Sequence, residues 1–201
     1  MKKIIFSFAL LLLLGAAAQG QVHMGLKAGA NTVGMKLKNF NPNATYQQAT
    51  APDRKWGYHG GVFFRVQLAN FFVRPEALYT NLRQSFTATQ ANGADTTGAF
   101  DFERIDLPLL VGTSFGPLRV YGGGVYSVNL PNSAGALEDQ LEDGTVGYQV
   151  GAALKLGDFL VEARYEGPIT TTARRIVLNN TQFDTDLRVN QFILSVGYEL
   201  F

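Results

Sequence analysis

The sequence predicts an all-β fold: an eight-stranded antiparallel up-and-down β-barrel that spans a membrane, with short turns at one end and long loops at the other. Three observations predict it. Eight segments alternate apolar and polar residues with period two, the strand period. The connections between these segments are alternately short and long. The charges in the body of the segments lie on one face, which leaves the opposite face apolar.

The eight expected strands occupy most of the chain after residue 20. They span 22–31, 57–68, 71–82, 101–113, 117–128, 145–156, 158–170 and 187–201. The connections after the second, fourth and sixth strands are minimal: Ala69-Asn70, Ser114-Phe115-Gly116 and Gly157. The other connections are long and polar, at 32–56, 83–100, 129–144 and 171–186. Short periplasmic turns and long extracellular loops are typical of barrels in the bacterial outer membrane.

Residues 1–20 have the pattern of a secretory signal peptide, which leaves 21–201 as the predicted outer-membrane barrel domain. Lys2 and Lys3 precede an apolar run, and the small residues Ala16, Ala18 and Gly20 offer cleavage sites. An N-terminal membrane helix is the alternative, but the apolar run is shorter than the ~20 residues that such a helix needs. A secreted chain without a second long apolar run is either soluble or a membrane β-barrel.

Composition excludes several functional classes. There is no cysteine, which rules out disulfides, thiolate metal sites and the lipid anchor of a lipoprotein. The 17 basic residues fall to 15 once Lys2 and Lys3 are removed, against 16 acidic residues. The chain without these two lysines therefore has no surplus of basic residues that would indicate a nucleic-acid partner. The sequence contains no metal-binding or cofactor-binding motif, so none is predicted.

The content of the two faces indicates which solvent each one meets. The charged face contains ionic residues of both signs: Lys27, Arg65, Arg74, Glu76, Arg104, Asp106, Arg119, Lys155, Glu162, Arg164, Glu166 and Glu199. A lysine or arginine that faces lipid at the midplane costs about 2–4 kcal/mol. The charged face is therefore predicted to line the lumen, while the face with Phe64, Leu109 and Val150 is predicted to meet lipid.

Ten of these residues are predicted to form a structural ionic network: Lys27, Arg65, Arg74, Glu76, Arg104, Asp106, Arg119, Glu162, Arg164 and Glu166. Side chains can fill the interior of an eight-stranded barrel, and buried charges need partners of opposite sign. The network is therefore expected to leave no wide pore. A soluble lipocalin-like barrel, with its apolar face inside, is the alternative for the whole fold.

Aromatic residues, prolines and glycines predict local features of the wall. An aromatic girdle is expected from tyrosines near strand ends: Tyr58, Tyr79, Tyr126, Tyr148 and Tyr198. Pro75 and Pro108 lie inside expected strands of a barrel without a free edge, so a bulge or a local break in pairing is expected at each. The run Gly122-Gly123-Gly124 lies in a strand with no helix after it, so it is expected to relieve crowding rather than bind phosphate.

Four segments, in order along the chain, resemble the PorT-like outer-membrane β-barrel family. They are 25–31, 72–79, 105–110 and 196–201, and both prolines fall within them. The resemblance implies an outer-membrane location and a barrel fold, and it implies no catalytic residues. The terminal Phe201 resembles the signal that the barrel-assembly machinery reads, although Phe201 falls out of phase with Tyr198 and Leu200.

His59 is the candidate for catalysis, because some eight-stranded barrels are lipid-modifying enzymes that use histidine with serine and a carboxylate. Its potential partners in the sequence are Ser85, Ser127, Glu166 and Asp101. A polar lumen residue is the expected role, since a triad is defined by geometry.

The long loops offer two further candidates. Glu138, Asp139, Glu142 and Asp143 lack calcium-loop spacing, so they are expected to form a solvated acidic loop. Trp56, at the end of the first long loop, could take part in recognition by an exposed loop, and an anchor at the membrane interface explains the same residue without a ligand.

The sequence therefore favours an outer-membrane barrel with a structural or interaction role and no catalysis. It would contact outer-membrane lipid, use the barrel-assembly machinery during biogenesis and display loops that could dock an envelope partner. The alternatives are a narrow small-solute channel, a lipid-modifying enzyme and the soluble lipocalin-like ligand-binding barrel.

Overall fold

The structure is a computed structural model that describes residues 21–38, 46–50, 55–90, 95–130, 144–170, 173–178 and 181–201. Side chains are described for residues 22–34, 56–82, 103–130, 144–170 and 190–201. The expected signal peptide and the acidic residues Glu138, Asp139, Glu142 and Asp143 lie outside the described residues. In the described part of the chain, no helix is long and apolar enough to cross a membrane.

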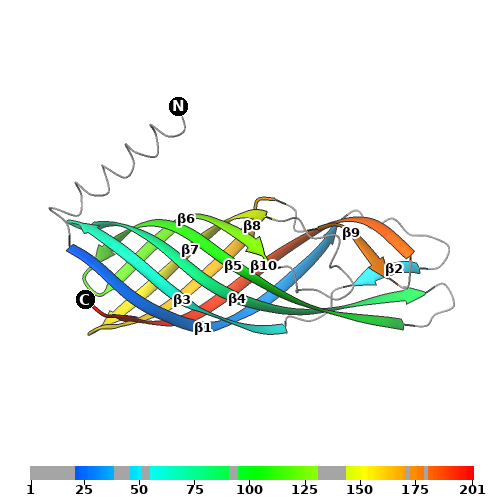
Figure 1. The fold of residues 1–201 in the computed structure, drawn as a ribbon, viewed down its shortest axis with the longest axis horizontal. Coiled ribbons are helices and arrows are strands. Elements are labelled where there is room, and N and C mark those ends of the chain that lie inside the picture. Colours follow the sequence, from blue (N-terminus) through cyan, green and yellow to red (C-terminus); the bar gives the residue numbers. More distant parts are fainter. Residues whose placement is uncertain are drawn as a thin grey trace, which may run out of the picture.

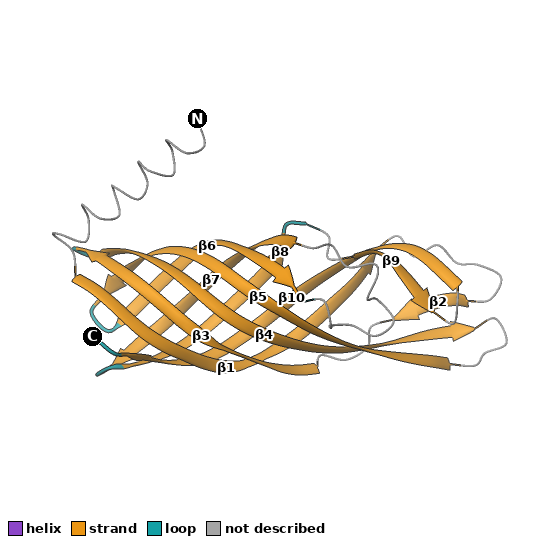
Figure 2. Ribbon diagram, viewed as in Figure 1, coloured by secondary structure: helices purple, strands orange, loops and turns teal. Residues whose placement is uncertain are grey.

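Eight long strands form a closed antiparallel barrel (Figures 1 and 2). They are β1 (Gln21–Lys38), β3 (Lys55–Leu68), β4 (Phe71–Gln90), β5 (Asp95–Phe115), β6 (Leu118–Asn129), β7 (Gly144–Leu156), β8 (Phe159–Pro168) and β10 (Thr181–Glu199). Each strand pairs with the next, and β1 pairs with β10 from Gly25↔Glu199 to Lys38↔Asp186, which closes the cylinder. The predicted fold class is confirmed.

Several expected strand ends were wrong, because the strands continue far into the segments assigned to long loops. Strands β4 and β5 stay paired from Leu82↔Phe102 to Thr89↔Asp95, through most of the expected loop at 83–100. Two short strands, β2 (Tyr46–Thr50) and β9 (Ala173–Leu178), also lie in expected loops and pair with β4 and β10. Threonine-rich segments favour strands whether or not one face is apolar, so the loss of apolar alternation marks the end of the lipid-facing region and not the end of the strand.

The strands that overrun the barrel wall all project at one end. Figure 1 shows the extended β4–β5 pair, β2 and β9 at the end opposite the C-terminus, while the short turns lie near the C-terminus. On β5, pairing with β6 begins at Arg104↔Asn129, so the β5 residues before it pair with β4.

Three two-residue turns join the strands at the other end. Ala69-Asn70 is the predicted turn, with Ala69 at φ 51°. The second turn is Gly116-Pro117 and the third is Gly157-Asp158, with the glycines at φ 60° and 64°. Ser114 and Phe115 belong to β5, since they pair with Arg119 and Leu118.

The two faces of the wall have the predicted polarity. Phe64, Leu109 and Val150 are 45%, 56% and 50% exposed on the outside. Arg74 and Glu162 are 0% and 1% exposed inside. A soluble barrel with an apolar interior is therefore excluded, and the lipocalin-like alternative was wrong.

Apolar side chains also occupy the lumen, a feature that the charge pattern does not predict. Phe63, Phe72, Leu110 and Leu160 are fully buried on the inner face. Phe72 packs edge-on against Tyr121, with 6.4 Å between ring centroids. The barrel interior is thus a mixed core, in which rings and aliphatic groups fill the space beside the ionic residues.

The two strand prolines coincide with gaps in the hydrogen-bonded ladders. Pairing of β3 with β4 runs to Phe63↔Glu76 and resumes at Val66↔Val73, so it skips Pro75. Pairing of β4 with β5 runs to Pro75↔Leu109 and resumes at Leu78↔Asp106, so it skips Pro108. The register is the same on both sides of each gap. The expected local breaks are confirmed, and neither proline needs a bulge because each places its missing N–H donor at a gap.

The three-glycine run relieves crowding at its centre. Gly123 faces inward, where an added Cβ would lie 2.0 Å from the Leu109 carbonyl oxygen. The outward positions Gly122 and Gly124 have nothing closer than 3.4 and 3.9 Å. Only the middle glycine is required by close approach of the neighbouring strand.

Aromatic side chains gather on the outer wall near both ends of the strands. Trp56, Tyr58, Tyr126 and Tyr148 are exposed toward the loop end, where Tyr79 is half-buried and lies 6.4 Å from the ring of Tyr58. Toward the short turns, the exposed rings include Phe71, Phe115, Phe159 and Tyr198. The arrangement matches the two aromatic girdles of membrane barrels.

The C-terminal residues stay bound to β1 beyond the end of β10. The Leu200 N–H donates to the Met24 carbonyl at 2.8 Å, and the Met24 N–H donates to the Phe201 carbonyl at 3.0 Å. Closure of the barrel therefore reaches the last residue, and Phe201 lies exposed at the rim.

Candidate functional site

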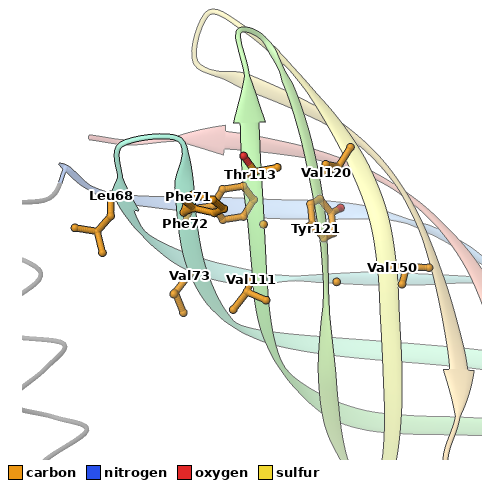
Figure 3. A pocket seen from close by; sticks show the side chains of 11 residues that line it. Leu68, Phe71, Phe72, Val73, Val111, Thr113, Val120, Tyr121 and Val150 are labelled. Carbon is orange, nitrogen blue, oxygen red and sulfur yellow. The ribbon is translucent and has the colours of Figure 1, made fainter.

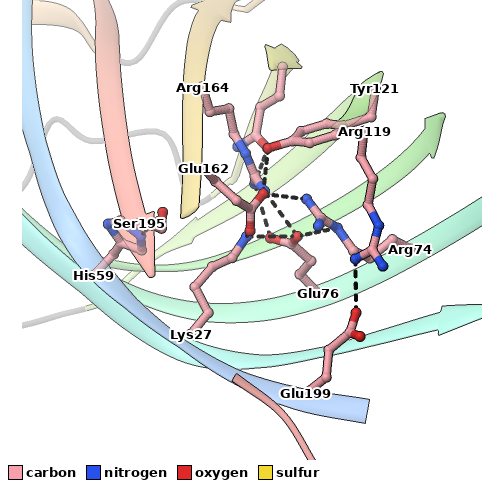
Figure 4. A network of polar contacts seen from close by, with 11 residues as sticks. Lys27, His59, Arg74, Glu76, Arg119, Tyr121, Glu162, Arg164, Ser195 and Glu199 are labelled. Atoms are coloured by element: carbon pink, nitrogen blue, oxygen red, sulfur yellow. Dashed lines mark hydrogen bonds and ion pairs between the residues drawn. The ribbon is translucent and has the colours of Figure 1, made fainter. Parts of the chain in front are cut away.

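The centre of the lumen holds three cations around two carboxylates (Figure 4). Lys27 comes from β1, Arg74 and Glu76 from β4, and Glu162 and Arg164 from β8. Glu162 lies 2.6 Å from both Lys27 Nζ and Arg74 Nη2, and 3.2 Å from Arg164 Nη2. Glu76 lies 3.0 Å from Lys27 Nζ, 2.9 Å from Arg74 Nε and 3.0 Å from Arg164 Nη1. Each carboxylate thus contacts all three cations.

Aromatic rings complete the central cluster. The Tyr121 hydroxyl donates to Glu162, and the guanidinium carbons of Arg74 and Arg164 lie 4.4 and 5.2 Å from the Tyr121 ring centroid. Arg74 also lies 5.8 Å from the Phe63 ring. Cation–π attraction at such desolvated sites offsets the positive surplus of the cluster.

A second cluster lies toward the loop end of the lumen. Arg104 contacts Asp106 at 2.8 Å and Glu166 at 2.6 Å. The hydroxyls of Thr80 and Ser127 donate to Asp106 at 2.6 and 2.5 Å.

Gln149 joins this second cluster to the centre. Its amide nitrogen donates to Glu166 at 2.7 Å, and its amide oxygen accepts from Arg164 at 2.7 Å. The polar contacts therefore form a continuous chain along the inside of the barrel.

A third cluster lies at the mouth near the short turns. Glu199 accepts hydrogen bonds from Arg65 at 2.8 Å, Arg119 at 2.9 Å and Lys155 at 2.6 Å. All ten residues of the predicted network therefore lie in one of three clusters, and the structure adds Lys155, Glu199, Tyr121 and Gln149 to them. Taken together, the described lumen has more cations than carboxylates, and the surplus is largest at this mouth.

The clusters determine what the lumen can do. Burying an ion is unfavourable by several kcal/mol unless opposite charges and hydrogen bonds compensate it. Here each buried carboxylate has at least two donors from cationic, hydroxyl or amide groups. The charges therefore link the strands of the barrel across its interior. Among the described residues, no group of three or more His, Cys, Asp or Glu side chains is placed to hold a metal ion.

His59 has a partner that is not among the candidates predicted from the sequence. Its Nε2 lies 2.9 Å from Ser195 Oγ on β10, and both residues are buried. Its Nδ1 has no hydrogen-bond partner among the described residues. Ser127 and Glu166 instead bind Asp106 and Arg104, and the side chains of Ser85 and Asp101 lie outside the described residues. The described part of the site thus contains a serine–histidine pair with no carboxylate to orient the ring.

An apolar hollow of about 690 Å³ lies on the outer wall over β3 to β7 (Figure 3). Phe71, Val73, Val111, Val120 and Val150 line it. Gly122 offers no side chain on this face, which helps to leave the hollow open. Its lining is mostly apolar, like the rest of the lipid-facing wall.

A closed wall with an apolar exterior, two aromatic girdles and a charged interior defines an outer-membrane β-barrel protein. The chain belongs to the outer membrane protein beta-barrel domain family, whose sequence profile matches residues 17–174. The protein is thus located in the outer membrane.

Solved structures that resemble this chain have little sequence in common with it. It is similar to Ail, the attachment invasion locus protein of Yersinia pestis, with a TM-score of 0.50, 14% identity, and 90% of this chain and 99% of Ail covered. AlkL, an outer membrane protein solved in lipid bilayers, gives a TM-score of 0.48 and 16% identity over 88% of this chain and 90% of AlkL. Comparison with curated proteins finds no match.

Proposed function

We propose that this protein is a non-conducting, non-catalytic outer-membrane barrel of the PorT-like kind, with a structural or interaction role. The observation that supports it is the central cluster, in which the side chains of Lys27, Arg74, Glu76 and Glu162 are fully buried on the barrel axis. A solute would have to displace ions that are each bound to several partners. A narrow channel is therefore disfavoured.

Planar-bilayer conductance and liposome swelling test this proposal. The wild-type barrel is expected to give no conductance above that of bare lipid. The double variant Arg74→Ala/Glu162→Ala removes one charge of each sign, so the net charge of the central cluster is unchanged while its bulk is lost. Conductance is expected only in this variant. Stable single-channel steps in the wild-type protein would contradict the proposal.

The interaction role is assigned to the end where the strands overrun the barrel. β4 and β5 pair as far as Thr89↔Asp95, well beyond the outward Tyr79 and Tyr126 near the girdle. A paired arm of this length offers a firm platform for an envelope or extracellular partner. An epitope inserted between Asn92 and Gly93 is expected to be labelled on intact cells, whereas the same epitope at Ala69-Asn70 is expected to need permeabilised cells.

The absence of catalysis is supported by His59 and Ser195, which are both buried and lack an orienting carboxylate within the described residues. Lipid A composition in cells that express His59→Ala is expected to equal that with wild-type protein. A lipid modification that disappears with His59→Ala would favour the enzyme alternative.

The proposed partners are outer-membrane lipid and, during biogenesis, the barrel-assembly machinery. Phe201 is exposed at the rim next to the closing pair of strands, where an assembly factor could reach it. Removal of Phe201 is expected to lower the fraction of heat-modifiable barrel in cells, whereas Phe115→Ala, at another exposed ring near the turns, is expected to leave that fraction unchanged.

A further inference from the structure

The mouth of the barrel at the short turns contains a hollow of about 190 Å³. Five strands surround it, through His23, Arg65, Ser114, Arg119 and Lys155. Because the short turns of an outer-membrane barrel face the periplasm, this hollow opens toward the periplasm.

Positive charge in the hollow exceeds negative charge by two. Arg65, Arg119 and Lys155 all donate to the same carboxylate, Glu199, at 2.6–2.9 Å (Figure 4 shows the Arg119–Glu199 contact). Both oxygens of Glu199 are occupied by these contacts. In the central cluster, by contrast, two carboxylates serve three cations. The mouth is therefore the part of the described lumen with the least anionic compensation.

Donors in the hollow remain without acceptors. Arg65 is 2% exposed, and its Nε has no hydrogen-bond partner, although Nη1 donates to Gln67 at 2.8 Å and Nη2 to Glu199. Ser114 Oγ, on β5, is buried and also lacks a partner. A buried donor without an acceptor is unfavourable, and a bound anion would satisfy both groups at once.

We propose that this hollow is an oxyanion-binding site of the phosphate class, formed by Arg65, Arg119, Lys155 and Ser114. Arginine guanidinium groups match the oxygens of phosphate in paired hydrogen bonds. A phosphate monoester has a charge of about −1.5 to −2 at neutral pH, which equals the surplus of the mouth. Lys155, whose side chain is 33% exposed, lies at the rim where an anion would enter.

Isothermal titration calorimetry with inorganic phosphate tests the site, using the folded full-length barrel in zwitterionic detergent at low salt. The wild-type protein is expected to bind one phosphate saturably, and acetate at least about tenfold more weakly. Lys155→Gln is expected to weaken phosphate binding about tenfold, the effect of losing one charge-assisted hydrogen bond. Arg175→Gln, which removes the same charge from β9 at the opposite end, is expected to change nothing.

Glu199→Gln gives a test of opposite sign. Removing the competing carboxylate frees three cations, so phosphate binding is expected to strengthen. Arg65→Gln is expected to abolish it, and Lys155→Gln covers the case in which that variant does not fold. No saturable binding to the wild type, equal weakening in Arg175→Gln, or weaker binding in Glu199→Gln would each overturn the proposal.

Binding of inorganic phosphate in nanodiscs of two lipid compositions shows whether the phosphate group comes from a lipid headgroup or from a soluble ester. If the headgroup of an anionic lipid occupies the site, phosphatidylglycerol discs will show weaker apparent binding of inorganic phosphate than phosphatidylcholine discs. If the ligand is a soluble periplasmic phosphate ester, both discs will bind inorganic phosphate and glycerol 3-phosphate alike. Either pattern supports the site and distinguishes its ligand.

Discussion

Arg74 on β4 donates a hydrogen bond to Glu162 on β8 across the barrel interior, at 2.6 Å, although the two residues are 88 positions apart in the chain. Lys27 on β1 lies at the same distance from the other Glu162 oxygen. The Glu162 carboxylate therefore connects three strands, β1, β4 and β8, that are not neighbours in the wall. Its removal should disturb the barrel as a whole.

Glu162→Gln is expected to lower the free energy of unfolding by about 3–5 kcal/mol, because it leaves buried cations without their counter-charge. Urea titration in lipid vesicles, followed by heat-modifiable migration on gels, measures the change. Asp158→Asn removes a carboxylate from an exposed turn and is expected to stay within about 0.5 kcal/mol of wild type. Equal effects of the two variants would show that the lumen charges contribute nothing specific.

The face of the wall that each strand residue occupies could be predicted from the sequence, because the energetic cost of a charge in lipid acts on each residue separately. Arg74, Glu162 and Arg164 were thus placed inside, and Phe64, Leu109 and Val150 outside. Depth along the barrel axis could not be predicted, because it depends on strand register and on the tilt of the closed wall. Lys27 could be assigned to the lumen, but its ion pair with Glu162 could not be predicted.

His59 and Ser195 illustrate the same limit. Both lie at positions of their strands that face the lumen. They are nevertheless 136 positions apart and lie on β3 and β10, with β1 between them. Gly29 on β1 has no side chain at this level, and a Cβ there would lie 2.7 Å from the His59 ring. An inward glycine in a strand is the one sequence signal that could have indicated a contact across it.

The strand ends beyond the membrane could not be predicted from alternation. Outside the bilayer both faces of a strand meet water, so polar residues occupy both and the period-two pattern disappears. The pairs from Leu82↔Phe102 to Thr89↔Asp95 persist because backbone hydrogen bonds do not depend on that pattern.

Gly123→Ala is expected to destabilise the barrel by about 1–3 kcal/mol, the usual effect of overpacking. Its added methyl group would meet the Leu109 carbonyl on the neighbouring strand. Gly124→Ala is the matched control, since it adds the same group one residue later on the open outer face. The urea midpoints of the two variants measure the difference, and a larger loss in Gly124→Ala would contradict the assigned faces.

Ala69→Gly is expected to stabilise the barrel by about 1 kcal/mol, because alanine is unfavourable in the left-handed region that it occupies here. Gly116→Ala and Gly157→Ala are expected to have the opposite effect of similar size. An added Cβ has nothing within 4 Å at either glycine, so only the backbone conformation differs. Unfolding midpoints of the three variants in the same vesicles provide the comparison, and stabilisation by Gly157→Ala would contradict the turn geometry.

Leu109→Arg is expected to cost about 2–4 kcal/mol, because Leu109 faces lipid near the middle of the wall. It lies six residues before Phe115, the last residue of β5. That spacing corresponds to about 15 Å of depth for a strand tilted by roughly 40°. Leu68→Arg, at the end of β3 beside the Ala69-Asn70 turn, is the control. It is expected to cost only about 0–1 kcal/mol, since arginine at the interface reaches water. Equal costs in vesicles would contradict the membrane depth assigned to these strands, whereas a cost that rises with depth is specific to a lipid-facing wall.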